Sequence, residues 1–114
     1  IHPGVVKRET AETMTKMLVR VVDEALLGGA LKNPRYSIAA KTGTAQIANP
    51  AGGGYSDEYL HAFFGYGPAF DAKFSIFLFM ARPHGERYAA RTLSGPFMDI
   101  MDFLLSYYRV PPDR

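Results

Sequence analysis

The spacing of apolar positions predicts a helix near each end of the chain. In residues 10–27 apolar side chains recur every three or four positions, which is typical of an amphipathic helix packed on a core; these are Met14, Met17, Leu18, Val21, Ala25 and Leu26. Thr10 is expected to cap this helix, and Gly28 and Gly29 are expected to end it. A second stripe predicts a helix within residues 93–109, built on Phe97, Ile100, Met101, Leu104, Leu105 and Tyr108.

Three strands are predicted between these helices, over residues 36–46, 59–66 and 74–81. The first is poor in bulky side chains and contains Gly43, and a glycine inside a strand often marks a place where a ligand or another backbone comes close. The third is almost continuously apolar, so both of its faces are expected to be covered. Residues 47–57 contain three consecutive glycines and are predicted to form a mobile loop.

The order helix, strand, strand, strand, helix predicts an α+β fold and excludes a βαβ arrangement. The short connection between the last two strands predicts that they pair antiparallel. The last helix can cover one face of the third strand, whereas the first helix does not suffice for the other face. A further covering layer from outside these residues is therefore expected.

Composition narrows the classes of function. The chain has 114 residues, 47% of them apolar, which fits one folded domain. A net charge of +2 is too small to indicate a nucleic-acid partner. The absence of cysteine excludes disulfides, thiolate zinc sites and a cysteine nucleophile. No apolar run reaches the roughly 18 residues of a transmembrane helix.

The residues Lys41-Thr42-Gly43-Thr44 form the one stretch in which both the residue types and the predicted strand indicate a ligand-binding site. A cation beside two hydroxyl groups suits a carboxylate ligand. Gly43 lets a ligand backbone lie against the strand, so that the strand could add a peptide through main-chain hydrogen bonds. A phosphate-binding loop is excluded, because that motif has its glycines before the lysine and a helix after it.

Other polar residues favour structural roles. The three histidines lie far apart in the sequence and show no metal-ligand spacing, so no metal site is predicted. His61 falls in a strand and is expected to be a packed or hydrogen-bonded side chain. Asp99 and Asp102 share one face of the last helix and are expected to form its solvated edge.

The segment Lys41-Thr42-Gly43-Thr44-Ala45-Gln46 closely resembles the third active-site motif of penicillin-binding protein transpeptidases. The resemblance to class B members extends along nearly the whole chain. Helix-opening residues 10–13 resemble the segment before the motif, and residues 59–68, with their Gly-x-x-Pro turn, resemble the next strand. Residues 74–83 resemble the strand after that, and residues 95–113 resemble the final helix and tail.

This resemblance implies a role for each residue of the motif. Lys41 would organise the polar network around a serine nucleophile. The hydroxyls of Thr42 and Thr44 would bind the carboxylate of a β-lactam or of the peptide stem. The backbone N–H of Thr44 would be one of two oxyanion donors, and Gly43 would permit close approach of the substrate. Lys41 and Thr44 are thus the expected catalytic residues, with Thr42, Gly43 and Thr44 binding substrate.

The family's other two motifs are missing from this chain. The nucleophile motif is Ser-x-x-Lys, but the residues three positions after the five serines are Ala40, Tyr59, Leu78, Phe97 and Arg109. The second motif is Ser-x-Asn, and the residues two positions after those serines are Ala39, Glu58, Phe77, Pro96 and Tyr108. Because an acyl-enzyme cannot form without its serine, these 114 residues alone are not expected to catalyse the reaction.

The resemblance therefore implies that residues 1–114 are the C-terminal segment of a larger transpeptidase domain with a penicillin-binding-protein or serine β-lactamase-like fold, in which helices flank an antiparallel sheet. The parent would cross-link peptidoglycan stem peptides by serine acyl transfer and would be acylated by β-lactams. Two alternatives remain open: a serine β-lactamase or β-lactam sensor, and a non-catalytic binding module that kept the fold.

The same resemblance implies the ligands, partners and location of the parent protein. Its partners would be D-alanyl-D-alanine stem peptides, β-lactams and the remainder of the domain, with no nucleic acid and no metal or organic cofactor. It would act outside the cytoplasmic membrane, anchored by an N-terminal helix not contained in this chain. Association with other cell-wall synthesis proteins would fit that role.

Overall fold

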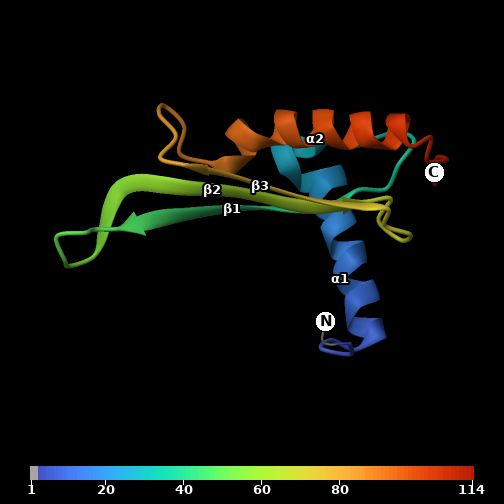
Figure 1. Ribbon diagram of the computed structural model, residues 1–114, viewed down its shortest axis with the longest axis horizontal. Coiled ribbons are helices and arrows are strands. Elements are labelled where there is room, and N and C mark those ends of the chain that lie inside the picture. The colour runs from blue at the N-terminus through green and yellow to red at the C-terminus, as the bar shows by residue number, and fades with distance from the viewer. Residues whose placement is uncertain (1–2) are drawn as a thin grey trace.

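The computed structural model describes residues 3–114 and has the predicted order of elements (Figure 1). The helices are α1 (Arg8–Arg20) and α2 (Ala89–Tyr107), and the strands are β1 (Ala39–Ala48), β2 (Tyr55–Gly67) and β3 (Phe74–Ala81). A π-helical turn, η1 (Val21–Ala25), and a 3-10 turn, η2 (Leu26–Gly29), continue α1. The predicted α+β class is confirmed.

The three strands form one antiparallel sheet in the order β1-β2-β3. Ala40 is paired with Gly65, and Gly65 with Ile76, so these three residues form a row across the sheet on one face. The helix α2 lies along that face, together with η1 and η2. The helix α1 crosses the sheet beside β1 and extends beyond the opposite face (Figure 1).

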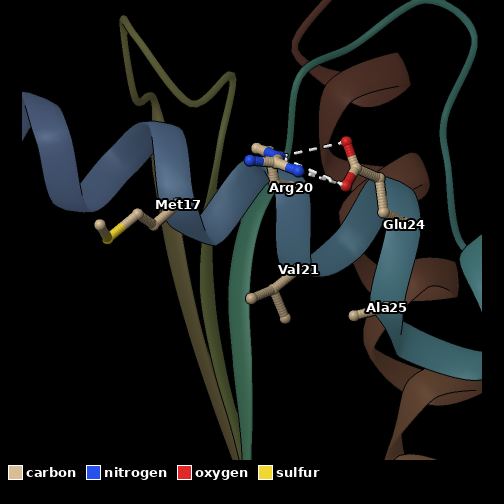
Figure 2. A pocket seen from close by; sticks show the side chains of 5 residues that line it. All are labelled: Met17, Arg20, Val21, Glu24 and Ala25. Carbon is tan, nitrogen blue, oxygen red and sulfur yellow. Dashed lines mark hydrogen bonds and ion pairs between the residues drawn. The ribbon is translucent and has the colours of Figure 1, made fainter.

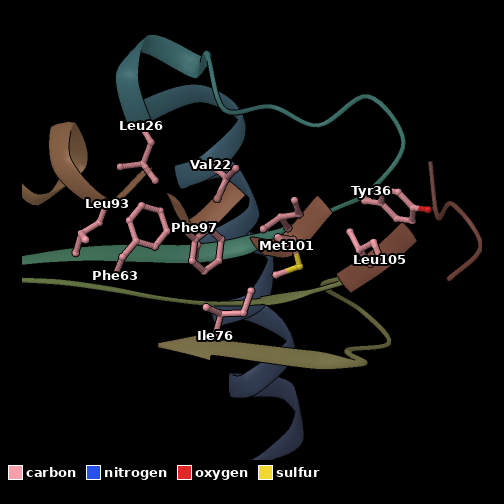
Figure 3. Close-up of a cluster of buried hydrophobic side chains, with 11 residues drawn as sticks. Val22, Leu26, Tyr36, Phe63, Ile76, Leu93, Phe97, Met101 and Leu105 are labelled. Atoms are coloured by element: carbon pink, nitrogen blue, oxygen red, sulfur yellow. The ribbon is translucent and has the colours of Figure 1, made fainter. Parts of the chain in front are cut away.

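The hydrophobic core lies between α2, the two short turns and one face of the sheet (Figure 3). The rings of Phe63 on β2 and Phe97 on α2 stack with their centroids 4.3 Å apart. Both rings are fully buried. Around this pair the core collects side chains from every element of that layer: Val22, Leu26, Tyr36, Ile38, Ala40, Ile76, Leu93, Met101 and Leu105.

Two glycines of β2 set the depth at which α2 packs. A Cβ atom on Gly65 would lie 2.6 Å from Cζ of Phe97 and 2.6 Å from Cβ of Ala40, closer than real contacts allow. A Cβ atom on Gly67 would lie 3.0 Å from Sδ of Met101. The helix therefore rests directly on the backbone of β2, and this approach is possible only because these positions carry no side chain.

The start of the first helix differs from the prediction. The helix α1 begins at Arg8, and its N-cap residue, Lys7, makes no side-chain capping hydrogen bond. Thr10 lies inside the helix, so the prediction that it caps the N-terminus is wrong. The predicted end is confirmed, because Gly28 and Gly29 adopt positive φ angles of 67° and 84° where the helical turns stop.

The predicted packing of the first helix is also wrong for most of its length. Met14 and Met17 are 52% and 58% exposed, and α1 has no buried residue. Burial begins only in the short turns, at Val22 and Leu26. The π-helical turn hydrogen-bonds to i+5, so it is wider than an α-turn and changes which positions face the core. A single helical period therefore does not describe the whole segment.

The bounds of β1, β2 and α2 also differ from the prediction. Strands β1 and β2 both extend into the predicted loop, which leaves residues 49–54 to connect them. The helix α2 begins at Ala89, four residues before the predicted range, and continues through Gly95 and Pro96. The first helical amide, that of Ala89, bonds to Thr44 on β1, and no local sequence pattern reveals this contact.

Only one face of β3 is covered within the described residues, in line with the expectation that the layer on the other face comes from outside them. Ile76 is buried and Leu78 half-buried against the α2 side, as expected. Phe77 and Phe79 lie on the opposite face, 60% and 66% exposed, and their rings stack at 6.3 Å. The continuous apolar run therefore reflects one covered face and one face that residues 3–114 leave open.

The C-terminal tail fastens the segment that leads into β1. The carboxylate of Asp113 accepts hydrogen bonds from the backbone N–H of Ser37, at 2.7 Å, and from the Ser37 hydroxyl. The guanidinium of Arg114 donates to both carboxylate oxygens of Asp23 in η1, at 2.6 and 2.9 Å. This hydrogen bond to Asp23 raises the pKa of Arg114 above its ordinary value. The tail thus ties η1 to the approach of β1.

Substitution of Gly65 tests the close packing of α2 on β2. We expect Gly65→Ala to lower the free energy of unfolding by about 1–3 kcal/mol, because the new methyl group overpacks the contact with Phe97. Gly43→Ala is the matched control on the neighbouring strand, since its Cβ would meet only Cβ of Ala62, at an ordinary 3.7 Å. Thermal unfolding of the intact protein measures both, and equal melting temperatures would contradict this account.

Substitution of Arg114 tests the contribution of the tail. The side chains of Arg114 and Asp23 are only 26% and 14% exposed, so we expect Arg114→Ala to cost about 1–2 kcal/mol of stability. The control is Arg20→Ala, which removes an ion pair with Glu24. Because the Arg20 side chain is 74% exposed, this loss should cost much less stability than Arg114→Ala. Denaturant unfolding of both variants compares them, and an equal loss would refute the assignment.

Candidate functional site

The outer edge of β1 presents unpaired backbone groups at Thr42 and Thr44. The hydrogen bond from Arg82 N to Tyr59 O directs the odd-numbered residues of β2 toward β3. The even-numbered residues of β2 therefore pair with the odd-numbered residues of β1, such as Gly43 opposite Ala62. The N–H and C=O groups of Thr42 and Thr44 consequently point away from the sheet, where no other strand of residues 3–114 pairs with them.

The side chains of the predicted motif lie on both faces of this edge. Thr42 and Thr44 are on the face that carries α2, whereas Lys41 and Gly43 are on the opposite face. The Lys41 side chain turns back toward the edge, so that Nζ donates to the carbonyl oxygen of Thr42 at 2.8 Å. The ammonium group, the two hydroxyls and the outward amides therefore share one edge of the sheet, despite starting from opposite faces.

Thr44 is connected to the start of α2. Its Oγ1 accepts a hydrogen bond from the backbone N–H of Ala89 at 3.0 Å. Because one lone pair is occupied by this amide, the hydroxyl proton of Thr44 remains available for another acceptor. The first amide of a helix also carries positive partial charge, which favours an anion nearby. Thr44 is thus a hydrogen-bond donor placed beside the helix N-terminus, an arrangement that suits a carboxylate.

Gly43 leaves the surface of this edge free of a side chain on the Lys41 face. Its backbone is exposed, and a Cβ there would meet only Cβ of Ala62 at 3.7 Å. Fold packing therefore does not require glycine at this position, in contrast to Gly65. The absence of a side chain leaves room for a ligand to approach the strand on the Lys41 face.

His61 is buried beside the motif, as the sequence predicts for a hydrogen-bonded histidine. It lies opposite Thr44 in the β1–β2 register, and both of its ring nitrogens are hydrogen-bonded. Its partners, Thr92 and the carbonyl of Arg87, flank the first residue of α2. Nothing in the sequence marks Thr92 and Ala89 as part of the site, because their contacts bridge 31 and 45 residues and leave no local signal.

Hollows elsewhere on the surface lie apart from the motif. One is lined only by α1 and η1, as Figure 2 shows for Met17, Arg20, Val21, Glu24 and Ala25. Another, largely apolar, lies between α1 and the aromatic side chains of Phe64 and Tyr66 on β2. None of the five motif and helix-start residues Lys41, Thr42, Gly43, Thr44 and Ala89 lines either hollow.

Two further features of the described residues bear on candidate functions. Within residues 3–114, no three His, Asp or Glu side chains gather closely enough to hold a metal ion. The helices of the same range are not long and apolar enough for any of them to cross a membrane.

Comparison with known proteins assigns the family. Residues 1–102 match the family described as the penicillin binding protein transpeptidase domain. The chain belongs to this family. The resemblance to class B penicillin-binding protein transpeptidases deduced from the motif is thereby confirmed.

Relatives of this transpeptidase family segment align along almost its whole length. It is 30% identical to the peptidoglycan D,D-transpeptidase FtsI of Buchnera aphidicola over 99% of the chain, and 34% identical to the penicillin-binding protein PbpB of Mycolicibacterium smegmatis over 94%. These matches cover 21% and 18% of the relatives, so the chain spans about a fifth of their length.

A solved structure agrees with the fold. Penicillin-binding protein 3 of Mycobacterium tuberculosis, crystallised with aztreonam, superposes with a TM-score of 0.79 at 30% identity, covering 96% of this chain and 27% of that one. The same protein has also been crystallised with ampicillin. The fold predicted from the sequence, a penicillin-binding-protein-like arrangement of helices and antiparallel strands, is therefore confirmed.

Proposed function

We propose that this chain is the C-terminal segment of a peptidoglycan D,D-transpeptidase domain and supplies the substrate-binding edge of its active site. The observation that carries the proposal is the free edge of β1, where Lys41 Nζ, the hydroxyls of Thr42 and Thr44 and two outward backbone amides lie together. A peptide ending in a carboxylate can add to such an edge as an extra strand. The Buchnera aphidicola relative is named a peptidoglycan D,D-transpeptidase, which supports the same reaction.

Each residue of the edge has a role in this proposal. The donor stem peptide lies along β1, and its terminal carboxylate accepts hydrogen bonds from Thr42 and Thr44. The outward N–H of Thr44 stabilises the oxyanion that forms when the scissile carbonyl is attacked, an interaction worth about 10²–10³ in rate. Lys41 places a positive charge near the reacting groups, and Gly43 leaves space for the peptide.

The nucleophile of this reaction belongs to another part of the protein. A serine hydroxyl there attacks the carbonyl carbon of the D-alanyl-D-alanine bond, and the terminal D-alanine leaves with the proton as its free amine. The resulting ester is attacked by an amine of a neighbouring stem peptide. That step forms the cross-link and returns the proton to the serine. Since the five serines of this chain lack the required motifs, the chain depends on the remainder of the domain.

The exposed apolar surfaces of these residues are consistent with a need for the remainder of the domain. The exposed rings of Phe77 and Phe79, the exposed methionines of α1 and the unpaired edge of β3 are covered by the remainder of the domain in this proposal. The parent protein acts outside the cytoplasmic membrane, held by an N-terminal anchor, and works with other cell-wall synthesis proteins. Its ligands are D-alanyl-D-alanine stem peptides and β-lactams.

Covalent labelling with a fluorescent penicillin tests the proposed function. We expect the full-length protein to be labelled and the 114-residue chain alone to remain unlabelled, because the nucleophile is outside it. A folded full-length protein that takes no label would refute the proposal and favour a non-catalytic module. Rapid hydrolysis of a chromogenic cephalosporin, in place of slow trapping, would instead identify a β-lactamase.

Substitution of Thr44 tests the assignment of the substrate-binding edge. We expect Thr44→Val in the full-length protein to slow β-lactam acylation by about 10- to 100-fold, the loss of one hydrogen bond to a charged group. Thr10→Val on α1 is the control, since Thr10 is exposed and lies on a different element. The second-order acylation rate constant is the measurement. Equal rate constants for the two variants would assign Thr44 a purely structural role.

A further inference from the structure

The side chain of His61 is fully buried and has a hydrogen-bond partner at each ring nitrogen. Nε2 lies 2.8 Å from the carbonyl oxygen of Arg87, and Nδ1 lies 2.8 Å from Oγ1 of Thr92. A carbonyl oxygen can only accept, so Nε2 carries a proton. In the neutral ring Nδ1 is then an acceptor, and the Thr92 hydroxyl donates to it. His61 therefore holds the chain on both sides of the residue at which α2 begins.

The start of α2 is capped in an uncommon way. Its N-cap residue, Tyr88, provides no side-chain hydrogen bond. The first helical amide, that of Ala89, donates instead to Oγ1 of Thr44 on β1. Ala89 is completely buried. This amide therefore lies between Arg87 and Thr92, which His61 holds, and it is bonded to Thr44 on β1.

The amide of Ala89 in turn determines the direction of the Thr44 hydroxyl. An Oγ1 that accepts from a fixed N–H directs its own proton away from that donor. Thr44 and His61 lie directly opposite each other in the β1–β2 register, on the face that carries α2. A shift of the helix start would therefore turn the Thr44 hydroxyl, even though His61 does not contact the outer edge of β1.

We propose that His61, acting through Thr92 and the Ala89 amide, is a positioning residue that holds the Thr44 hydroxyl as a donor toward the ligand carboxylate. This rests on the proposed function, in which Thr44 binds that carboxylate. His61 is hydrogen-bonded to Arg87 O and to Thr92 Oγ1, on the two sides of the helix start, and the Ala89 amide between these residues donates to Thr44 Oγ1. His61 is therefore more than a satisfied polar group of the core.

Thr92 is the residue best suited to test this arrangement. It is half-buried, and Thr92→Val removes only the hydroxyl while keeping the shape of the side chain. A substitution of the fully buried His61 would instead risk general unfolding. Thr92→Ser restores the hydroxyl. Ser106→Ala removes a hydroxyl from an exposed position near the other end of α2 and is the matched control.

The experiment is a double-variant cycle on acylation of the full-length protein. The ligands are a penicillin with a free carboxylate and its methyl ester, each measured by competition with a fluorescent penicillin. We expect Thr92→Val to slow acylation by the free acid about fivefold, the loss of one ordinary hydrogen bond, and to leave acylation by the ester unchanged. Thr92→Ser should restore the rate, and Ser106→Ala should not alter it.

The combination with Thr44→Val separates positioning from a general effect. Because His61 and Thr92 act through Thr44 in this proposal, the double variant Thr44→Val/Thr92→Val should be no slower than Thr44→Val alone. Rate losses that multiply in the double variant would overturn the positioning role, as would an equal loss with the ester. Either result would leave the proposed function standing if Thr44→Val alone still slows acylation by the free acid.

A failure of the proposed function gives a different result. If the single variant Thr44→Val acylates as fast as the parent, Thr44 does not bind the carboxylate, and the positioning role is refuted with it. Thermal unfolding of each variant identifies losses caused by misfolding. Should Thr92→Val unfold below the assay temperature, Thr92→Ala replaces it in the cycle with the same expected outcomes.

Discussion

The close contact between α2 and the backbone of β2 is the constraint on which the rest of the structure depends. Gly65 brings Phe97 onto the sheet at a distance that no side chain at that position would permit. Phe63 stacks on Phe97 beside this point, and Met101 continues the contact at Gly67. Because α2 is one continuous helix, its depth at these residues helps to set where its first turn meets the sheet.

That first turn lies at the candidate site. With Phe97 seated over Gly65, the N-terminus of α2 reaches β1, where the Ala89 amide bonds to Thr44. His61 secures the same turn from β2. The site is thus built on a strand edge supported from behind by a helix end, and this support holds the Thr44 hydroxyl in one orientation. An edge strand alone would be free to twist and would present its donors less precisely.

The segment before β1 is held in place by the C-terminal tail, whereas one face of the sheet is exposed. The C-terminal tail closes the approach to β1 through Asp113 and Arg114, so the strand is anchored before it reaches the motif. The other face of the sheet, with Phe77 and Phe79, stays open within residues 3–114. The apolar side chains of this open face are the surface that our proposal assigns to contact with the remainder of the domain.

The sequence alone determined the class of fold, the order of elements, the whole of β3 and the residues of the motif, because these follow from apolar periodicity and from local residue types. It also determined that His61 is a hydrogen-bonded side chain and that two glycines end the first helix. Met14 and Met17 stay exposed because α1 extends beyond the sheet (Figure 1), so burial begins at Val22 and Leu26, and the start of α2 at Ala89 is set by a hydroxyl 45 residues away. Both depend on contacts between segments distant in sequence, whose energies no local pattern records. Only the tertiary structure therefore decided which atoms of the motif reach the free edge of β1 and what holds them there.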